Sequence, residues 1–267
     1  MDKLNYQSMV NLFAIFTIGA LGIFAKDMRI IGGNNTRIYK NPFMASLRYI
    51  ESNIIFCGGS IISNKHILTA AHCVFRELDN VNSIVVYTGI ALTRSTSGWS
   101  HTIDTIVCHP EFTGEDSDDD EDSNDEIYVH DLAIITVNEE IRLNFLQNVI
   151  NLPNREIYDD DSGYVLGWGS TTHPNDTFPV ILQKAYMYIY PLANCSEMYD
   201  FRLHIGQFCA YNDVGIGPCM GDSGGPFVID GKIAGIVSFN YPCAHGVPDF
   251  YTNVYFYIDF IRNILNS

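Results

Sequence analysis

The chain has 267 residues, of which 47% are hydrophobic and 13% aromatic, a composition typical of a compact globular protein and not of a disordered one. Its formal charge of −16 at pH 7 argues against a nucleic-acid partner, which would need clustered Lys and Arg, and would repel an anionic membrane surface. These properties fit a protein that works in solution outside the cell.

The N-terminal segment indicates secretion. Lys3 lies in a short polar lead, and the residues from Met9 to Ala25 are almost wholly apolar. A stretch of about 15 apolar residues is short for a membrane span and typical of the core of a signal peptide. We therefore predict that residues 1–25 are a signal peptide cleaved after Ala25 and that the protein is secreted. An uncleaved membrane anchor is the alternative.

From Phe43 onward, short β-rich runs alternate with turn residues, without helical stretches between them. The expected strands are Ser46–Tyr49, Ser60–Ile62, Ser83–Tyr87, Leu132–Val137, Gly163–Gly167, Lys184–Tyr190, Pro226–Ile229 and Ile233–Ser238. Many short strands at this spacing predict an all-β sandwich or barrel. Apolar residues between Tyr257 and Leu265 recur at helical spacing, which predicts an amphipathic C-terminal α-helix over about residues 255–265.

Residues 115–126 break this pattern, because nine of the twelve are acidic. Their mutual repulsion and the lack of apolar side chains predict a solvated loop. The alternating Asp118, Asp120 and Asp122 resemble part of a calcium loop, but Ser123 stands where an EF-hand needs Gly. The cysteines form no C-x-x-C pair either, so the sequence predicts no metal site and no cofactor.

The stretch 221–226, which reads GDSGGP, is the most informative motif. Its three glycines let the backbone turn tightly around Ser223, expose the hydroxyl and aim N–H groups at a bound carbonyl. A serine needs a base to become a useful nucleophile, and His72 in the motif TAAHC supplies one. Asp131 leads an apolar strand in the motif HDLAII. Each signal is modest alone, but the three in the order His, Asp, Ser are far more specific.

On these motifs the sequence resembles the chymotrypsin–trypsin family of serine endopeptidases from Ile30 to about Leu265. The resemblance implies an all-β fold of two six-stranded antiparallel β-barrels with a C-terminal α-helix. The peptidase domain would span residues 30–267, with the first barrel at about 30–140 and the second at about 141–254. The catalytic cleft would lie between the barrels.

The resemblance also assigns roles to the motif residues. Ser223 attacks the scissile carbonyl, His72 accepts the serine proton and later protonates the leaving amine, and Asp131 orients the imidazole. The backbone N–H groups of Gly221 and Ser223 would bind the oxyanion, and one such donor is typically worth about 10²–10³ in rate.

A second resemblance concerns activation. The sequence RIIGG, from Arg29 to Gly33, resembles the family's activation junction, which is cut after a basic residue. The new Ile30 ammonium would turn inward and pair with Asp222, beside the nucleophile, and so order the oxyanion loop. Residues 26–29 would then be the activation propeptide of a zymogen.

All seven cysteines follow the predicted signal peptide, so an oxidising compartment would allow disulfides. By resemblance, the expected pairs are Cys57 with Cys73, Cys195 with Cys209, and Cys219 with Cys243. A further disulfide frequent in the family has neither partner, because Gly163 and Ile229 occupy its positions, which suggests an alternative packed core. Cys108 remains unpaired, either as a buried free thiol or as a site of intermolecular pairing.

The specificity pocket departs from trypsin. Trypsin-like members carry an Asp at the pocket floor, where this chain has Gly217, and the alignment places Asp249 on the pocket wall, where Gly is usual. A Gly floor with a wall Asp resembles the arthropod brachyurin-like collagenolytic proteases, in which a displaced carboxylate accepts Lys or Arg while the pocket also takes large apolar side chains. The alternative is that Asp249 is only a loop residue, because the loop before it looks one residue short.

The pocket edge departs as well. The strand that usually reads Ser-Trp-Gly is Ser238, Phe239 and Asn240 here, and Asn240 would either narrow the entrance or hydrogen-bond to substrate. Met220, at the lip, is a flexible apolar neighbour like that of the chymotrypsin branch. We therefore predict broad or chymotrypsin-like cleavage with some tolerance of Lys and Arg.

The expected partners are protein or peptide substrates, an activating protease and proteinaceous inhibitors. A digestive role is the first hypothesis, because no regulatory module precedes the catalytic domain. A protease of limited specificity that acts on host, haemolymph or blood proteins is the second, and the acidic segment and Asn240 favour it. An inactive homologue that serves as a binding module is the third, and the complete set of triad residues argues against it.

Overall fold

The computed structural model describes residues 30–114, 128–199, 203–240 and 243–267. The predicted signal peptide, the propeptide with Arg29 and the acidic segment 115–126 lie outside the described residues. Within the described ranges, the helices are too short or too polar to cross a membrane.

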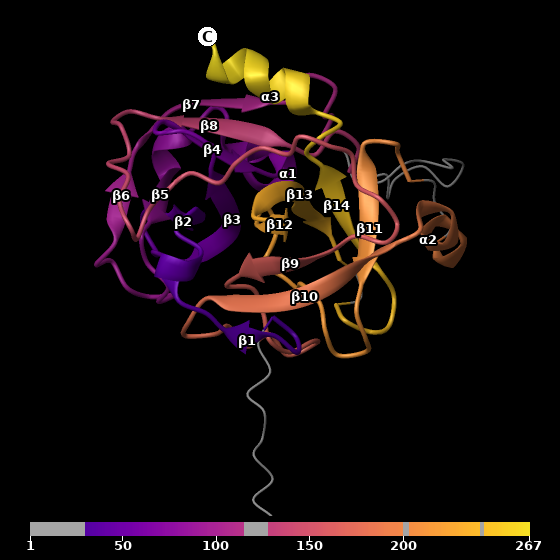
Figure 1. Ribbon diagram of the computed structural model, residues 1–267. Helices are drawn as coiled ribbons and strands as arrows, with labels where there is room; N and C mark the ends of the chain where they lie inside the picture. Colours follow the sequence, from indigo (N-terminus) through magenta and orange to yellow (C-terminus); the bar gives the residue numbers. More distant parts are fainter. Residues whose placement is uncertain (1–29, 115–127, 200–202, 241–242) are drawn as a thin grey trace, which may run out of the picture.

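Two antiparallel sheets organise the chain (Figure 1). The first has the spatial order β6 (Trp99–His101), β5 (Ile84–Thr88), β2 (Met44–Tyr49), β3 (Ile55–Ile61), β4 (His66–Thr69), β8 (Ala133–Val137) and β7 (Ile103–Cys108). Only Thr102 separates β6 from β7, so the two ends of the sheet belong to one interrupted strand. The sheet therefore closes into the first predicted six-stranded barrel, with one strand broken in two.

The second sheet has the order β1 (Asn34–Asn35), β10 (Gln183–Tyr190), β11 (Gln207–Tyr211), β14 (Asp249–Asn253), β13 (Lys232–Phe239), β12 (Pro226–Ile229) and β9 (Ser162–Gly167). β9 also pairs with β10, which closes six strands into the second barrel. The two-residue β1 is an addition to it. The predicted division near residue 140 assigned this segment to the first barrel, whereas β1 pairs with β10 of the second.

Alternating burial explains why these segments form strands. In β10, the side chains of Ala185, Met187 and Ile189 are buried, while Tyr186 and Tyr188 between them are exposed. This period of two is that of a strand with one face on the core and the other in water.

Helices are few and short in the described chain. They are α1 (Ala71–Val74), α2 (Leu192–Met198), α3 (Ile258–Leu265) and the 3₁₀ turns Ile38–Lys40, Phe75–Glu77 and Val81–Ser83. The predicted C-terminal helix is confirmed as α3, although it begins at Ile258 and not near residue 255. It lies over β7 and β8 in Figure 1 and buries Ile261 completely, a burial worth about 1.5–3 kcal/mol.

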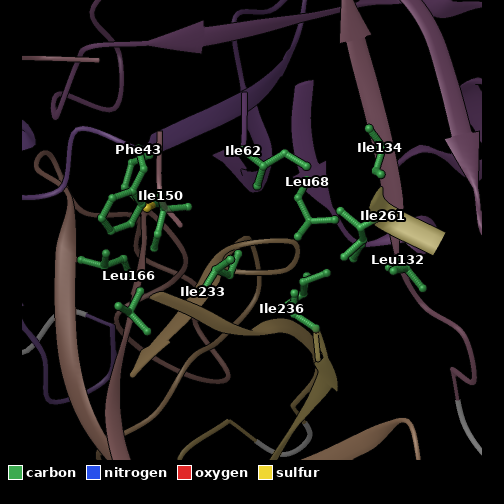
Figure 2. Packing of buried hydrophobic residues seen from close by; sticks show 14 of the residues in the cluster. Phe43, Ile62, Leu68, Leu132, Ile134, Ile150, Leu166, Ile233, Ile236 and Ile261 are labelled. Carbon is green, nitrogen blue, oxygen red and sulfur yellow. The ribbon is translucent and has the colours of Figure 1, made fainter. Parts of the chain in front are cut away.

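The two barrels share a hydrophobic core, which fixes their relative position (Figure 2). Leu68 and Ile134 of the first barrel pack in the same cluster as Leu166 and Ile236 of the second, and each of these four side chains is fully buried. A close-packed interior resists relative motion of the barrels. The cleft between them therefore has rigid walls.

The structure contains the three disulfides that the resemblance implied, Cys57–Cys73, Cys195–Cys209 and Cys219–Cys243. Where the fourth is missing, a Cβ added to Gly163 would lie 2.5 Å from the Phe227 ring and 3.0 Å from the Ile229 side chain, so these two side chains pack over the glycine in place of a sulfur bridge. Cys108 is a half-buried free cysteine at the end of β7, and burial, with a smaller effect of Asp131, raises the pKa of its thiol to about 11.

Candidate active site

Asp131 lies just before β8 and is completely buried. One carboxylate oxygen accepts the His72 backbone N–H at 2.8 Å, and the other lies 2.8 Å from His72 Nδ1. Ser238 Oγ donates to the same second oxygen at 2.5 Å. Burial alone would raise the pKa of Asp131, but the His72 ring and the hydrogen bonds outweigh burial and hold the pKa below its ordinary value.

His72 sits on the single turn α1, directly after β4, and its side chain is 22% exposed. The contact to Asp131 therefore anchors one edge of the imidazole on the buried side, while the ring still reaches the cleft. A carboxylate on Nδ1 fixes the ring orientation and the tautomer with the proton on that nitrogen. Nε2 then carries the lone pair that a general base needs.

Ser223 lies in the turn before β12 and is held between the two barrels. Its carbonyl oxygen accepts the N–H of Gly58 in β3 at 2.8 Å. Gly224 follows at φ +75°, and a Cβ there would lie 2.2 Å from Thr69 Oγ1 and 2.5 Å from the Gly58 carbonyl oxygen. Only glycine allows the nucleophile turn to approach the first barrel this closely.

His72, Gly221 and Ser223 line one surface cleft, together with residues of both barrels. Gly221 adopts φ +94°, a conformation that L side chains rarely adopt, and only Asp222 separates it from Ser223 in the sequence. Two neighbouring N–H groups in such a turn form an anion-binding concavity.

The segment that starts at Ile30 is docked on the second barrel. The Ile30 side chain is fully buried in a cluster with Val165 and Phe227. Gly217 N–H donates to the Ile31 carbonyl at 3.0 Å. The residues that follow the predicted cleavage point therefore lie against Gly217, the predicted floor of the specificity pocket.

Asp222 is fully buried, and its carboxyl group packs closely against Gly167 and Gly169. A Cβ added to either glycine would lie within 2.4 Å of that carboxyl group. Its two oxygens accept N–H groups of Gly169 at 2.7 Å and Cys219 at 3.0 Å. Burial nevertheless raises the pKa of Asp222 to about 7, because these two bonds only partly offset the loss of water. A nearby cation would reverse that shift.

Gly217 and Asp249 lie side by side, as the alignment implied. A Cβ added to Gly217 would be 2.8 Å from the Asp249 carboxylate oxygen, so an aspartate could not occupy both positions without a shift. Asp249 begins β14, where it pairs with Ala210, and is 3% exposed. Burial and, to a smaller degree, the charge of Asp222 raise the pKa of Asp249 well above its ordinary value.

The remaining pocket candidates are Met220, Ser238, Phe239 and Asn240. Phe239 stacks on Phe250 at 5.9 Å between ring centroids, and Met220 is exposed at the cleft. The side-chain nitrogen of Asn240 is buried and has no hydrogen-bond partner in the described chain. Ser238, expected at the pocket edge, donates its hydroxyl to Asp131.

Two further residues were absent from the predicted site. Tyr128 packs its ring 5.3 Å from His72 and 5.8 Å from Phe239, and so closes one side of the cleft. Thr252 Oγ1 donates to the Asp131 carbonyl at 2.8 Å. No sequence signal marks either residue, because the contacts join segments that lie far apart in the chain.

Three groups of side chains in the described ranges are compact enough to hold a metal ion. Two of them contain the disulfides Cys57–Cys73 and Cys219–Cys243, whose sulfurs cannot serve as thiolate ligands. The third consists of His109, Glu111 and His130.

Two closed β-barrels with His, Asp and Ser at their junction define a serine endopeptidase of the two-barrel class. The chain belongs to the trypsin family, whose model, described as Trypsin, matches residues 30–261.

Individual relatives agree with this assignment. The chain is 30% identical to kallikrein-8 of Homo sapiens over 247 residues, which cover 91% of this chain and 89% of that protein. It is 31% identical to chymotrypsin-2 of Vespa crabro over 234 residues, which cover 87% and 98%. The solved structure of neuropsin, a serine protease expressed in the limbic system of mouse brain, superposes with a TM-score of 0.77 at 26% identity and covers 87% of this chain and 98% of that one.

Proposed function

We propose that this chain is a secreted serine endopeptidase that is activated by cleavage after Arg29 and uses Ser223, His72 and Asp131 as its catalytic triad. The observation that carries the proposal is the buried Asp131–His72 pair, 2.8 Å apart, beside a cleft that Ser223 also lines. Secretion is supported by the three disulfides, which persist in oxidising compartments.

In the proposed mechanism, Ser223 Oγ bonds to the scissile carbonyl carbon while His72 Nε2 takes the hydroxyl proton. The N–H groups of Gly221 and Ser223 bind the resulting oxyanion. The C–N bond then breaks as His72 gives the proton to the leaving amine, which leaves an acyl-enzyme. A water molecule deprotonated by His72 attacks the ester, and the acid product departs as Ser223 regains its proton. Asp131 stays ionised throughout and stabilises the imidazolium.

The proposed activation step uses the burial of Asp222. In the uncut chain, residue 30 contributes an amide and supplies no cation to the carboxylate, which accepts the N–H groups of Gly169 and Cys219. Cleavage after Arg29 would turn the Ile30 nitrogen into an ammonium ion. An ammonium within a few ångströms favours the charged carboxylate and lowers its pKa. The free energy of this ion pair would stabilise the turn that holds Gly221.

The proposed specificity is broad or chymotrypsin-like, with tolerance of Lys and Arg. Gly217 leaves the floor open, and Phe239 and Met220 offer apolar contacts to a large side chain. The Asp249 carboxylate beside the floor would accept a cationic side chain, as in the brachyurin-like proteases that the pocket resembles. The unpaired Asn240 amide would donate to a substrate carbonyl. Broad specificity of this kind is suited to a digestive role.

A panel of peptides that differ only in the residue before the scissile bond tests the specificity. We expect cleavage after Phe, Tyr and Leu at rates comparable with one another, and slower cleavage after Lys and Arg. Strict preference for Lys and Arg would refute the proposed pocket while leaving the triad intact. The absence of cleavage after every residue would refute the catalytic proposal.

A further inference from the structure

A cluster of nitrogen and oxygen ligands lies next to the triad but takes no part in the proposed mechanism. His109 and Glu111 follow β7, His130 directly precedes Asp131, and Tyr257 precedes α3. The fold thus brings together two segments of the first barrel and the C-terminal helix.

The three ionisable side chains lie close together, and His109 Nδ1 accepts the Glu111 backbone N–H at 3.3 Å, a hydrogen bond that a metal ion would replace. Glu111 Oε2 lies 4.0 Å from His109 Nδ1 and 3.6 Å from His130 Nε2. Each residue can contribute one ligand atom, and the three ligand atoms lie within 4.8 Å of one another. In a tetrahedral zinc site with bonds of 2.0–2.1 Å, ligand atoms are about 3.3 Å apart, so binding would draw the three ligand atoms closer together.

A hydrogen bond orients His130, and aromatic contacts surround His109. Tyr257 Oη lies 3.0 Å from His130 Nδ1, which leaves the opposite nitrogen of that ring turned toward Glu111. The His109 and His130 rings stack at 4.7 Å with 10° between their planes, so the His109 ring must turn before both imidazoles can bind one ion, and Phe260 packs against His109 at 4.8 Å. A hydrogen bond on the second ring nitrogen is the arrangement that orients metal-binding histidines in proteins.

We propose that His109, Glu111 and His130 form a binding site for a divalent transition-metal ion of the zinc class. Two imidazoles and one carboxylate are ligands that zinc prefers, whereas calcium takes six or more oxygens. Because Glu111 is exposed, water can complete the coordination from the solvent side. The charge of −16 raises the local concentration of cations around the protein.

Isothermal titration of the protein with zinc chloride tests the site, with Ser223→Ala in every sample to prevent self-digestion. We expect one saturable site per chain. Glu111→Gln should weaken it by about 10–100-fold, since losing a ligand costs at least as much as losing an outer-shell partner. Glu140→Gln, which removes the same charge from another exposed position, should leave zinc binding unchanged. Calcium chloride at equal concentration should not compete.

Because His130 packs against Tyr257, His130→Gln can also disturb folding, whereas the exposed Glu111 can change without loss of a buried contact. Equal zinc affinity in the parent and in the Glu111→Gln variant would overturn the proposal, since the ion would then lie on His72 or outside the described residues. Saturation weaker than a Kd of about 1 mM, or equal competition by calcium, would overturn it as well.

Discussion

Replacing Asp249 by Asn isolates the contribution of the pocket-wall carboxylate to specificity. The change keeps the size of the side chain, which is 3% exposed and lies against Gly217, and removes its charge. Removing one member of a buried charge pair costs about 2–5 kcal/mol. We therefore expect kcat/KM for peptides with Arg or Lys before the scissile bond to fall by about 30-fold to about 4,000-fold. The kcat/KM for peptides with Phe at this position should change little, because the uncharged Phe side chain forms no ion pair with residue 249.

The pH dependence sharpens this prediction. Burial and the neighbouring Asp222 raise the pKa of Asp249, so the free enzyme at low pH holds a neutral carboxyl group. Binding a cationic side chain then requires loss of that proton, at about 1.4 kcal/mol for each unit between pH and pKa. The ratio of Arg to Phe cleavage should rise about tenfold per pH unit below the pKa of Asp249 and level off above it. In the Asp249→Asn variant the ratio should be flat.

The assay measures kcat/KM for matched Arg, Lys and Phe peptides between pH 5 and 9, normalised to the active-site concentration. Asp213→Asn, which removes the same charge from an exposed residue, serves as the control and should behave as the parent. Equal loss for Arg and Phe peptides would show that the substitution damages the fold of the pocket. An unchanged Arg rate would refute the placement of Asp249 as a cation acceptor.

Three further predictions concern activation and the oxyanion turn. The stability of the uncut precursor relative to its Asp222→Asn variant should be greatest below pH 4 and fall by about 4 kcal/mol between pH 4 and 8, because burial raises the folded-state pKa of Asp222 to about 7 from 3.8; a pH-independent difference in urea unfolding would contradict this. Gly221→Ala should lower kcat by about 100-fold or more with little effect on KM, since φ +94° is strained for alanine and the oxyanion donor moves; a loss confined to KM would argue for a binding role only. Arg29→Gln should leave an intact, inactive precursor on gels after exposure to trypsin, and full activity in that uncleaved variant would refute the activation mechanism.

Local sequence motifs account for most of the fold and for the candidate triad. The strand Pro226–Ile229 has the predicted bounds, because an apolar run follows a glycine turn and ends at Asp230. By contrast, α2 was not predicted, since its one buried residue is Cys195 and a seven-residue segment of this kind has no apolar period. A disulfide and the packing around it, not helix propensity, hold that segment in place.

Side-chain contacts between segments that are distant in the chain could not be predicted at the site. The hydrogen bond from Ser238 to Asp131 could not be predicted, because the two residues are 107 positions apart in the chain. The cluster of His109, Glu111 and His130 was missed for the same reason, because its ligands are separated by the acidic segment and meet only when β7 and β8 pair. Gly217 and Asp249 were predicted to lie together because members of the family place the matching positions in one pocket. Their spacing in the sequence does not indicate this contact.

Covalent labelling of the cleaved protein with a fluorophosphonate tests the central claim most directly. We predict a single modified residue, Ser223, identified by mass spectrometry of the labelled peptide. Labelling should be absent from the Ser223→Ala and His72→Ala variants, and it should be weak before cleavage after Arg29. Folded, cleaved protein that takes up no label, or labelling that persists when Ser223 is replaced, would contradict it.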